Sequence, residues 1–310
     1  MTAAPEALPA TPHVGRRGLL RFAAARFWRQ PAAVAALLLV VTIFTAGALA
    51  SVLAPQGWNA INLNPHALNQ PPSLAHPFGT DAIGREMFVR TLYGVRTTAE
   101  IALGGALLAT LLAVITGTLA GFYGGWPDAT TMRVADLVSA YPAVVITLAA
   151  LVYLGQAYPH HLVLIFGAYM WASAARVIRA HVVSLRDSEF VEAARAFGAS
   201  DLRILARHIL PNASGTILVA ATSLVGQIVL IDATVEFFNY GLSSSVSPSL
   251  GNLVADVVQD KFGLAVYWWQ QLPPVGWWTW VFPAAVLVLI LVCINLVGDA
   301  LDAALNPTAA

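Results

Sequence analysis

Apolar residues in this chain gather in long runs that contain almost no charge. A helix needs about 20 such residues to cross ~30 Å of hydrocarbon at about 1.5 Å per residue. The pattern predicts six membrane-spanning helices, at residues 32–54, 101–122, 137–158, 162 to the region of Arg176, 213–231 and 275–297. The expected fold class is therefore an all-α membrane protein with six transmembrane helices.

Three details qualify these spans. Arg176 and Arg179 interrupt the fourth run early, so we expect both arginines to reach a surface or to face protein. Pro142 lies inside the third run and is expected to kink it. Gly117 and Gly121 form a GxxxG pattern in the second run, which favours close helix packing within the chain or between subunits.

Composition agrees with the pattern, because 58% of the residues are hydrophobic and only 10% are charged. An ordinary soluble domain carries roughly 25% charged residues, so a water-soluble globule is excluded. The formal net charge is zero, and nothing in it indicates a nucleic acid as a partner. Cys293 lies in an apolar run without a second cysteine to pair with.

The distribution of basic residues predicts the orientation. With the amino terminus inside, twelve of the 16 basic residues fall on the cytoplasmic side and four, namely Arg85, Arg90, Arg96 and Lys261, fall outside. Basic loops are retained in the cytoplasm, so both termini are expected there. The protein is expected to be a multi-pass membrane protein, and the family resemblance described below implies the bacterial cytoplasmic (inner) membrane.

The predicted organisation has five parts. Residues 1–31 form a cytoplasmic tail, 32–54 an uncleaved first helix, 55–96 a proline-rich external loop, 97–304 a core of five helices, and 305–310 a second cytoplasmic tail. A second large external loop spans 239–274 and ends among tryptophans. These tryptophans fit an interfacial belt better than a ligand-stacking surface.

The cytoplasmic loop 184–212 carries charge beside apolar residues at helical spacing. Its first apolar stripe consists of Phe190, Val191, Ala194 and Phe197, and its second of Leu202, Leu205, Ala206 and Ile209. Gly198 permits the left-handed conformation that ends a helix, and Ser200 or Asp201 suits a new helix start. Pro211 is expected to stop the second helix before the fifth span.

Two short amphipathic helices of this kind have three explanations. They could lie on anionic lipid, or be a solvated loop with accidental periodicity. The mixture of acids and bases beside an apolar stripe favours docking into a groove of a partner protein. A channel subunit that docks on some other protein satisfies the same pattern.

Three common motifs of nucleotide-binding proteins, metalloproteases and serine hydrolases are absent from the sequence. It contains no GxxxxGK[ST], no HExxH and no GxSxG, so no catalytic residue and no metal site is expected. The adjacent His160 and His161 point to different faces of a helix and are expected at the interface rather than on a metal. We therefore expect a protein that is not an enzyme and binds no cofactor directly.

Two acids stand near the outer end of the fifth span. Asp232 and Glu236 are separated by four residues, and like charges at this spacing are costly unless they meet water or a partner. They are candidates for the solute pathway or for the outer gate. Contact with the substrate, contact with a partner at the external mouth, and simple placement in the loop remain open.

The loop also resembles a known family. Glu192-Ala193-Ala194, followed by Gly198 and by Leu210-Pro211, resembles the EAA loop of permease subunits in binding-protein-dependent ABC importers, specifically the dipeptide/oligopeptide branch. The segments "HPFGTDAIGREMFVRTLYGVR" (76–96), "GFYGGWPD" (121–128) and "NLVGDALDAALNP" (295–307) are similar to that branch, and to the shorter of its two partner permeases.

The resemblance implies a type I ABC importer permease-like fold whose cytoplasmic coupling helices lie in the loop between helices 4 and 5. It implies that this loop enters a groove of the ATPase through Glu192, Ala193, Ala194, Arg195, Gly198, Asp201, Leu210 and Pro211. The implied partners are a homologous second permease, two ATPase subunits that hold ATP and magnesium, and an external binding protein. The solute could be a dipeptide, an oligopeptide, a nickel chelate or a saccharide.

Overall fold

The computed structural model describes residues 24–238, 240–243, 246–256 and 276–305. In this part of the chain the regular structure is helical, and the only extended pairing is one isolated bridge between Thr80 and Glu86. The helices whose bounds lie within the described residues are α2 (Pro31–Ala48), α3 (Ala50–Leu53), α4 (Met87–Tyr123), α5 (Gly125–Ser139), α6 (Ala143–Leu154), α7 (Pro159–Arg186), α8 (Glu189–Ala196), α9 (Asp201–Ile204), the π-helical η1 (Leu205–Ile209), α10 (Leu210–Phe237) and α12 (Trp278–Leu305). Residues 24–28 and 250–256 are helical as well.

The described helices give five or six candidate membrane spans. Five are long and apolar enough by themselves, and α5 with α6 makes a sixth if this bent pair counts as one span. The two helices meet at an angle of 77° across a short break. The third span is therefore not one continuous helix over 137–158. Pro142 precedes the first residue of α6 in an extended conformation, because proline cannot continue the α-helical hydrogen bonds.

Helix α4 begins earlier than the sequence pattern suggests. It starts at Met87, inside the segment 55–96 that we expected to be an external loop, and it runs for 37 residues. At about 1.5 Å per residue this is roughly 55 Å, well beyond the hydrocarbon thickness. Arg90 and Arg96 break the apolar run but are good helix formers, so the apolar pattern misses this first part. Residues 55–86 remain irregular apart from the short bridge.

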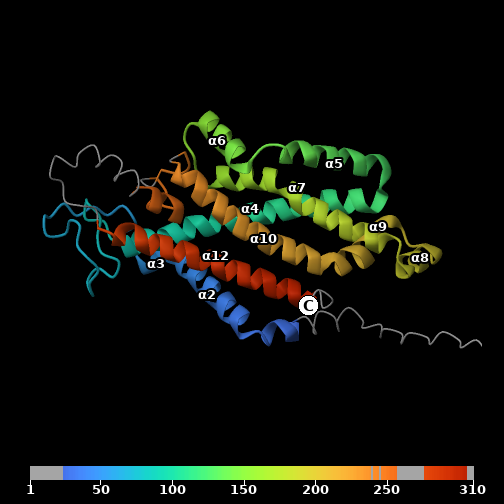
Figure 1. Ribbon diagram of the computed structural model, residues 1–310, viewed down its shortest axis with the longest axis horizontal. Helices are drawn as coiled ribbons and strands as arrows, with labels where there is room; N and C mark the ends of the chain where they lie inside the picture. The colour runs from blue at the N-terminus through green and yellow to red at the C-terminus, as the bar shows by residue number, and fades with distance from the viewer. Residues whose placement is uncertain (1–23, 239, 244–245, 257–275, 306–310) are drawn as a thin grey trace, which may run out of the picture.

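Helices α4 and α7 pack side by side through glycine (Figure 1). A Cβ atom on Gly117 would lie 2.7 Å from the carbonyl oxygen of Ala175, and one on Gly121 would lie 2.8 Å from that of Arg179. The GxxxG pattern thus brings two helix backbones together within the chain.

The two arginines of α7 are paired with α5. The Arg176 Nη2 donates to the Ala135 carbonyl and the Ser139 hydroxyl, each at 3.0 Å. Arg179 forms a bidentate ion pair with Asp128. These contacts offset the free-energy cost of placing two charged side chains in a long membrane helix, so α7 can continue to Arg186. The fourth span exists, with its arginines facing protein as expected.

The described ends of the chain lie toward one end of the molecule. Figure 1 shows the start of α2, the end of α12 and the pair α8 and α9 toward the same end, with the irregular residues 55–86 at the other. An even number of crossings between the two ends is consistent with this arrangement. Residues 257–275, which hold half of the second predicted loop, lie outside the described residues, as do residues 1–23 and 306–310 of the two expected tails.

The close approach at Gly117 leads to a stability prediction. Replacing Gly117 with alanine places a methyl group against the fixed backbone oxygen of Ala175, so we expect a loss of about 1–3 kcal/mol. Gly298→Ala is the matched control, because its nearest neighbour, the Thr222 Cγ2, is 3.7 Å away. There alanine should be neutral or raise stability by up to about 1 kcal/mol. Thermal unfolding of both variants in detergent measures the contrast, and equal midpoints would contradict the packing described.

Candidate functional site

Helices α8 and α9 are joined by a tight turn at Gly198. Gly198 has φ +77°, in the left-handed region that favours glycine. Its N–H donates to the Arg195 carbonyl at 2.9 Å, and the Ala199 N–H donates to the Ala194 carbonyl at 3.0 Å. This pair of hydrogen bonds is a Schellman motif, which satisfies the last carbonyls of α8. The predicted helix end at Gly198 is confirmed.

The second short helix begins where the sequence places it. Ser200 occupies the N-cap position of α9 in an extended conformation, although its side chain forms no capping hydrogen bond. Asp201 is the first helical residue and favours the positive end of the helix dipole. The structure therefore selects Ser200 as the cap position and Asp201 as the first residue inside the helix.

The predicted apolar stripe of α8 is divided between the protein core and solvent. Val191 is fully buried and Ala194 packs partly against the core, whereas the Phe197 side chain is 91% exposed. On the second stripe, Leu205 and Ile209 are buried but Leu202 is 76% exposed. Each stripe thus attaches to the bundle by part of its residues. The first leaves Phe197 and, at 40% exposure, Phe190 outside, and the second leaves Leu202 outside.

Contacts with the end of α4 hold α8 in place. The Arg195 guanidinium lies over the Phe122 ring, 5.6 Å from its centroid, in a cation–π arrangement. Just before α8, Arg186 donates to Asp187 at 3.0 Å, and this hydrogen bond lowers the pKa of the exposed Asp187 carboxyl. Arg186 also donates from Nη1 to the Gly121 carbonyl at 3.4 Å, so the two arginines connect α8 and the residues before it to the end of α4.

Pro211 does not end the second helix, which corrects the expectation from the sequence. The helical path runs without a break from Asp201 to Phe237, through α9, η1 and α10. Within it, residues 205–209 form a π turn, and the Leu210 N–H donates to the Leu205 carbonyl five residues back. A wider π turn lets the chain pass a residue that lacks an N–H and would clash in an α-helical turn.

The residues that the family resemblance assigns to ATPase coupling lie along this loop. Those on its exposed surface are Glu192, Ala193, Arg195, Gly198 and Asp201, while Ala194, Leu210 and Pro211 are half-buried. The loop thus presents two acids and a base around Phe197 and Leu202.

The two acids of α10 are buried. Asp232 and Glu236 are each 1% exposed, so neither side chain meets solvent in this structure. Glu236 accepts a hydrogen bond from the Leu242 N–H at 2.9 Å, while Asp232 Oδ1 has no partner among the described residues. Gly241 and Gly251 lie so close to Glu236 that a Cβ on either would approach it within 3 Å. Glu236 therefore fastens the segment after α10 to the carboxyl-terminal end of that helix.

A charged cluster lies at the amino-terminal end of α4, and the sequence pattern did not predict it. Arg90 is 3% exposed, and its two terminal nitrogens donate to Asp81 at 3.3 Å and to Asp256 at 3.2 Å. Asp81 also accepts from the Arg85 Nε at 2.6 Å. The spacing of Asp81 and Arg85 signals a local pair, but Asp256 lies 166 residues away from Arg90, and no local pattern points to it.

Metal chemistry has no support in the described part of the chain. There, no group of three or more histidine, cysteine, aspartate or glutamate side chains could hold an ion. The His161 ring instead accepts a hydrogen bond from the Tyr158 N–H at 3.3 Å, at the first turn of α7. This histidine helps to begin a helix.

The described helices are long enough to cross a membrane, charges are paired inside the bundle, and a charged loop is exposed at one end. These features are those of a polytopic membrane protein. The relatives of the sequence make the class specific. Residues 113–310 match the family described as "Binding-protein-dependent transport system inner membrane component". The chain belongs to this family, and it is an inner-membrane transport subunit, not an enzyme.

Individual relatives match along nearly their whole length. The oligopeptide transport system permease protein OppC of Mycobacterium tuberculosis is 33% identical over 283 residues, which cover 91% of this chain and 92% of the relative. A putative peptide transport system permease protein of Brucella abortus is 35% identical over 264 residues, or 84% of this chain and 83% of the relative. The similarity therefore includes the spans and the loop described above.

The Arg90 cluster generates a prediction about the outer end. Arg90→Leu leaves Asp81 and Asp256 without the cation that they share. We expect the free energy of unfolding to fall by about 3 kcal/mol. This is the lower end of the range for a broken buried ion pair, because Asp256 is partly exposed. We expect faster chymotrypsin cleavage within residues 55–86 of the detergent-purified protein.

Arg96→Leu is the control for this variant, because Arg96 lies on the same helix but is exposed. It should leave the cleavage rate unchanged. If Arg90→Leu were cleaved no faster than Arg96→Leu, the cluster would not hold the outer segments together.

Proposed function

We propose that this chain is one of two homologous permease subunits of an ATP-driven peptide importer, and that it forms half of the pathway for dipeptides, oligopeptides or similar small solutes. Relatives whose names specify oligopeptide or peptide transport match more than four fifths of the chain, and this observation carries the assignment of the solute. A second permease, two ATPase subunits with ATP and magnesium, and an external binding protein complete the proposed complex.

The exposed face of the loop supports docking on an ATPase. Phe197 and Leu202 offer two large apolar side chains on either side of the Gly198 turn. Apolar anchors of this kind supply affinity when a groove buries them, while surrounding charges such as Glu192 and Asp201 set the register. We infer that α8 and α9 are the coupling helices.

The continuous helix from Asp201 to Phe237 supplies a route for movement. It contains 37 residues, roughly 55 Å at helical rise, and so reaches from the docking loop to the opposite end of the bundle. A displacement of α9 by a closing ATPase dimer would move α10 with it, because no flexible linker separates them. Rocking of this helix would shift the bundle between inward- and outward-facing states.

At its far end this helix carries Asp232 and Glu236, which we assign to the outer gate and not to solute contact. Glu236 holds the backbone at Leu242, so movement of α10 would carry the segment after the helix with it. Burial of both carboxyls argues against direct contact with a solute in this conformation.

For the orientation, we propose that the docking loop and both termini are cytoplasmic. Twelve of 16 basic residues then lie inside, as the positive-inside rule requires. The same choice places residues 55–86 and the Arg90 cluster outside, where a binding protein could approach.

The docking proposal predicts loss of ATPase binding when the two apolar anchors are removed together. Burial of each side chain is worth about 1.5–3 kcal/mol, so Phe197→Ser with Leu202→Ser should weaken the complex by at least about 100-fold. The measurement is retention of P-loop ATPase subunits during purification in mild detergent.

Leu74→Ser is the matched control, because Leu74 is fully exposed at the opposite end of the molecule and should have no effect. A wild-type chain that never retains a P-loop ATPase would overturn the transporter proposal and favour a channel or structural subunit. Undiminished retention by the double variant would overturn only the assignment of the docking face.

A second prediction isolates the Gly198 turn. Gly198→Ala adds a methyl group into open space, so its cost is the backbone strain of an alanine at positive φ, about 1–2 kcal/mol. We expect uptake to fall by about tenfold while the protein level in the membrane stays unchanged. Gly57→Ala has a similar φ and the same open surroundings in the outer segment, and should leave uptake normal. Equal uptake by the two variants would argue against a coupling role for this turn.

A further inference from the structure

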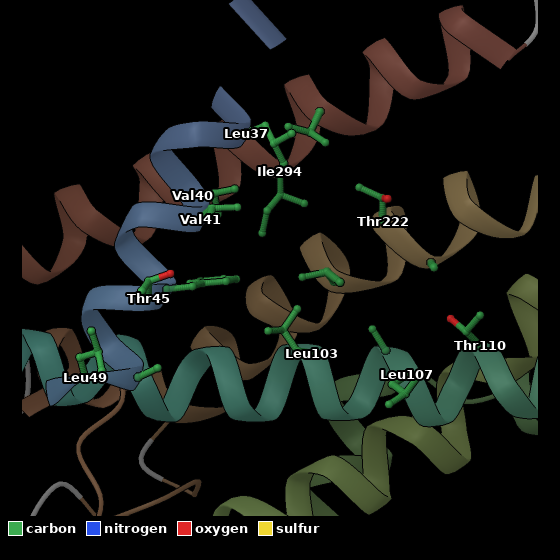
Figure 2. A pocket seen from close by; sticks show the side chains of 16 residues that line it. Leu37, Val40, Val41, Thr45, Leu49, Leu103, Leu107, Thr110, Thr222 and Ile294 are labelled. Atoms are coloured by element: carbon green, nitrogen blue, oxygen red, sulfur yellow. The ribbon is translucent and has the colours of Figure 1, made fainter. Parts of the chain in front are cut away.

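Helix α10 has two faces of opposite chemistry. One face lines an apolar groove of about 700 Å³ shared with α2, α4 and α12 (Figure 2). Thr222 is one of its few polar residues, and its hydroxyl donates to the Leu218 carbonyl of its own helix at 2.9 Å. This face satisfies its polar groups internally, and it suits hydrocarbon.

The other face of α10 lines a smaller cavity of about 300 Å³ between α7, α10 and α12. Its polar lining comes from all three helices and consists of Ser173, Thr216, Ser223, Gln227 and Asp302. A volume of this size equals roughly ten water molecules in the liquid and falls at the lower end of the range for ligand pockets.

The polar residues of α10 in this cavity form one stripe. Thr216, Ser223 and Gln227 are spaced by seven and four residues, which puts them on the same side of a helix. Eleven residues of helix extend roughly 16 Å, or about half of the hydrocarbon thickness. The stripe therefore runs lengthwise along the bundle.

None of the three side chains of the stripe forms a hydrogen bond with another described residue, and the two that are exposed are Ser223 and Gln227. An unsatisfied amide facing hydrocarbon costs several kcal/mol, so this face must meet water, a solute or polar protein. The hollow shape favours water and solute, since a closely packed helix would leave little space of this size.

We propose that this stripe, with Gln227 and Ser223 at its centre, is a part of the translocation pathway that binds the main chain of a passing peptide. The inference rests on the proposed peptide importer and adds the residues that touch the solute. Gln227 offers both a donor and an acceptor, and Ser223 offers a hydroxyl, which match peptide N–H and C=O groups. Because both side chains are neutral, they hold the backbone without selecting side chains.

Uptake by the complete complex tests the proposal. The probe is a mixture of isotope-labelled alanine peptides of two to five residues, supplied with the binding protein to reconstituted liposomes. Gln227→Leu should lower ATP-dependent uptake by about fivefold, and the double variant with Ser223→Ala by about 25-fold, as expected for one and two lost hydrogen bonds. Thr222→Val, on the apolar face of the same helix, is the matched control and should transport normally.

Accessibility to a charged, membrane-impermeant thiol reagent gives a second measurement that does not depend on transport. Gln227→Cys and Ser223→Cys should react in the nucleotide-free or the vanadate-trapped complex, because a pathway contains water. Thr222→Cys should stay unreactive, as should the buried native Cys293.

The outcomes separate the two proposals. Failure of the wild-type complex to take up any of the peptides would overturn the peptide importer, and with it this inference. Normal wild-type uptake with unchanged uptake by the Gln227→Leu and Ser223→Ala variants would overturn the inference alone. Cysteines at 223 and 227 that stay unreactive in both states would assign this face to contact with a second permease helix and would equally overturn it.

Discussion

The bilayer offers no hydrogen-bond partners, so the polar groups of this protein have to find them within the protein or in water. This constraint explains why Arg176 and Arg179 in α7 are paired with α5, a neighbouring helix about 40–50 residues earlier in the sequence. It explains the π turn that carries the backbone past Pro211, where an α-helical ladder would be interrupted. It also makes the exposed Gln227 informative, because an amide without a partner in the described chain indicates a face of α10 that meets water.

The described helices differ in how closely they are packed. Helices α4 and α7 approach closely at Gly117 and Gly121, and packed backbones of this kind resist sliding. The helix from Asp201 to Phe237 is far less buried, and it joins the docking loop at one end to Glu236 at the other. A transport subunit of the proposed kind needs both properties, namely a rigid pair of helices and a lever that responds to a partner.

Much of this was accessible from the sequence. Runs of apolar residues gave the spans, and the glycine at 198 gave the turn between two short helices, because left-handed backbone favours a residue without a side chain. The errors have physical causes as well. Arg90 and Arg96 concealed the first turns of α4, since an apolar pattern cannot follow a helix beyond the hydrocarbon. Pro211 was predicted to end the second short helix, because the rule that proline interrupts an α-helix does not consider a π turn supported by the surrounding bundle.

By itself, the sequence determined the fold class, the approximate spans, the place of the two short helices at Gly198 and the family resemblance, since these depend on local periodicity, turn chemistry and motif spelling. Only the tertiary structure decided which face of each helix is buried and which is exposed. It buried Val191 and exposed Phe197 on one short helix, brought Asp256 to Arg90 across 166 residues, and enclosed Asp232 and Glu236. It also separated a polar face of α10 from an apolar one. Such choices depend on contacts between distant segments, which a local pattern of residues does not encode.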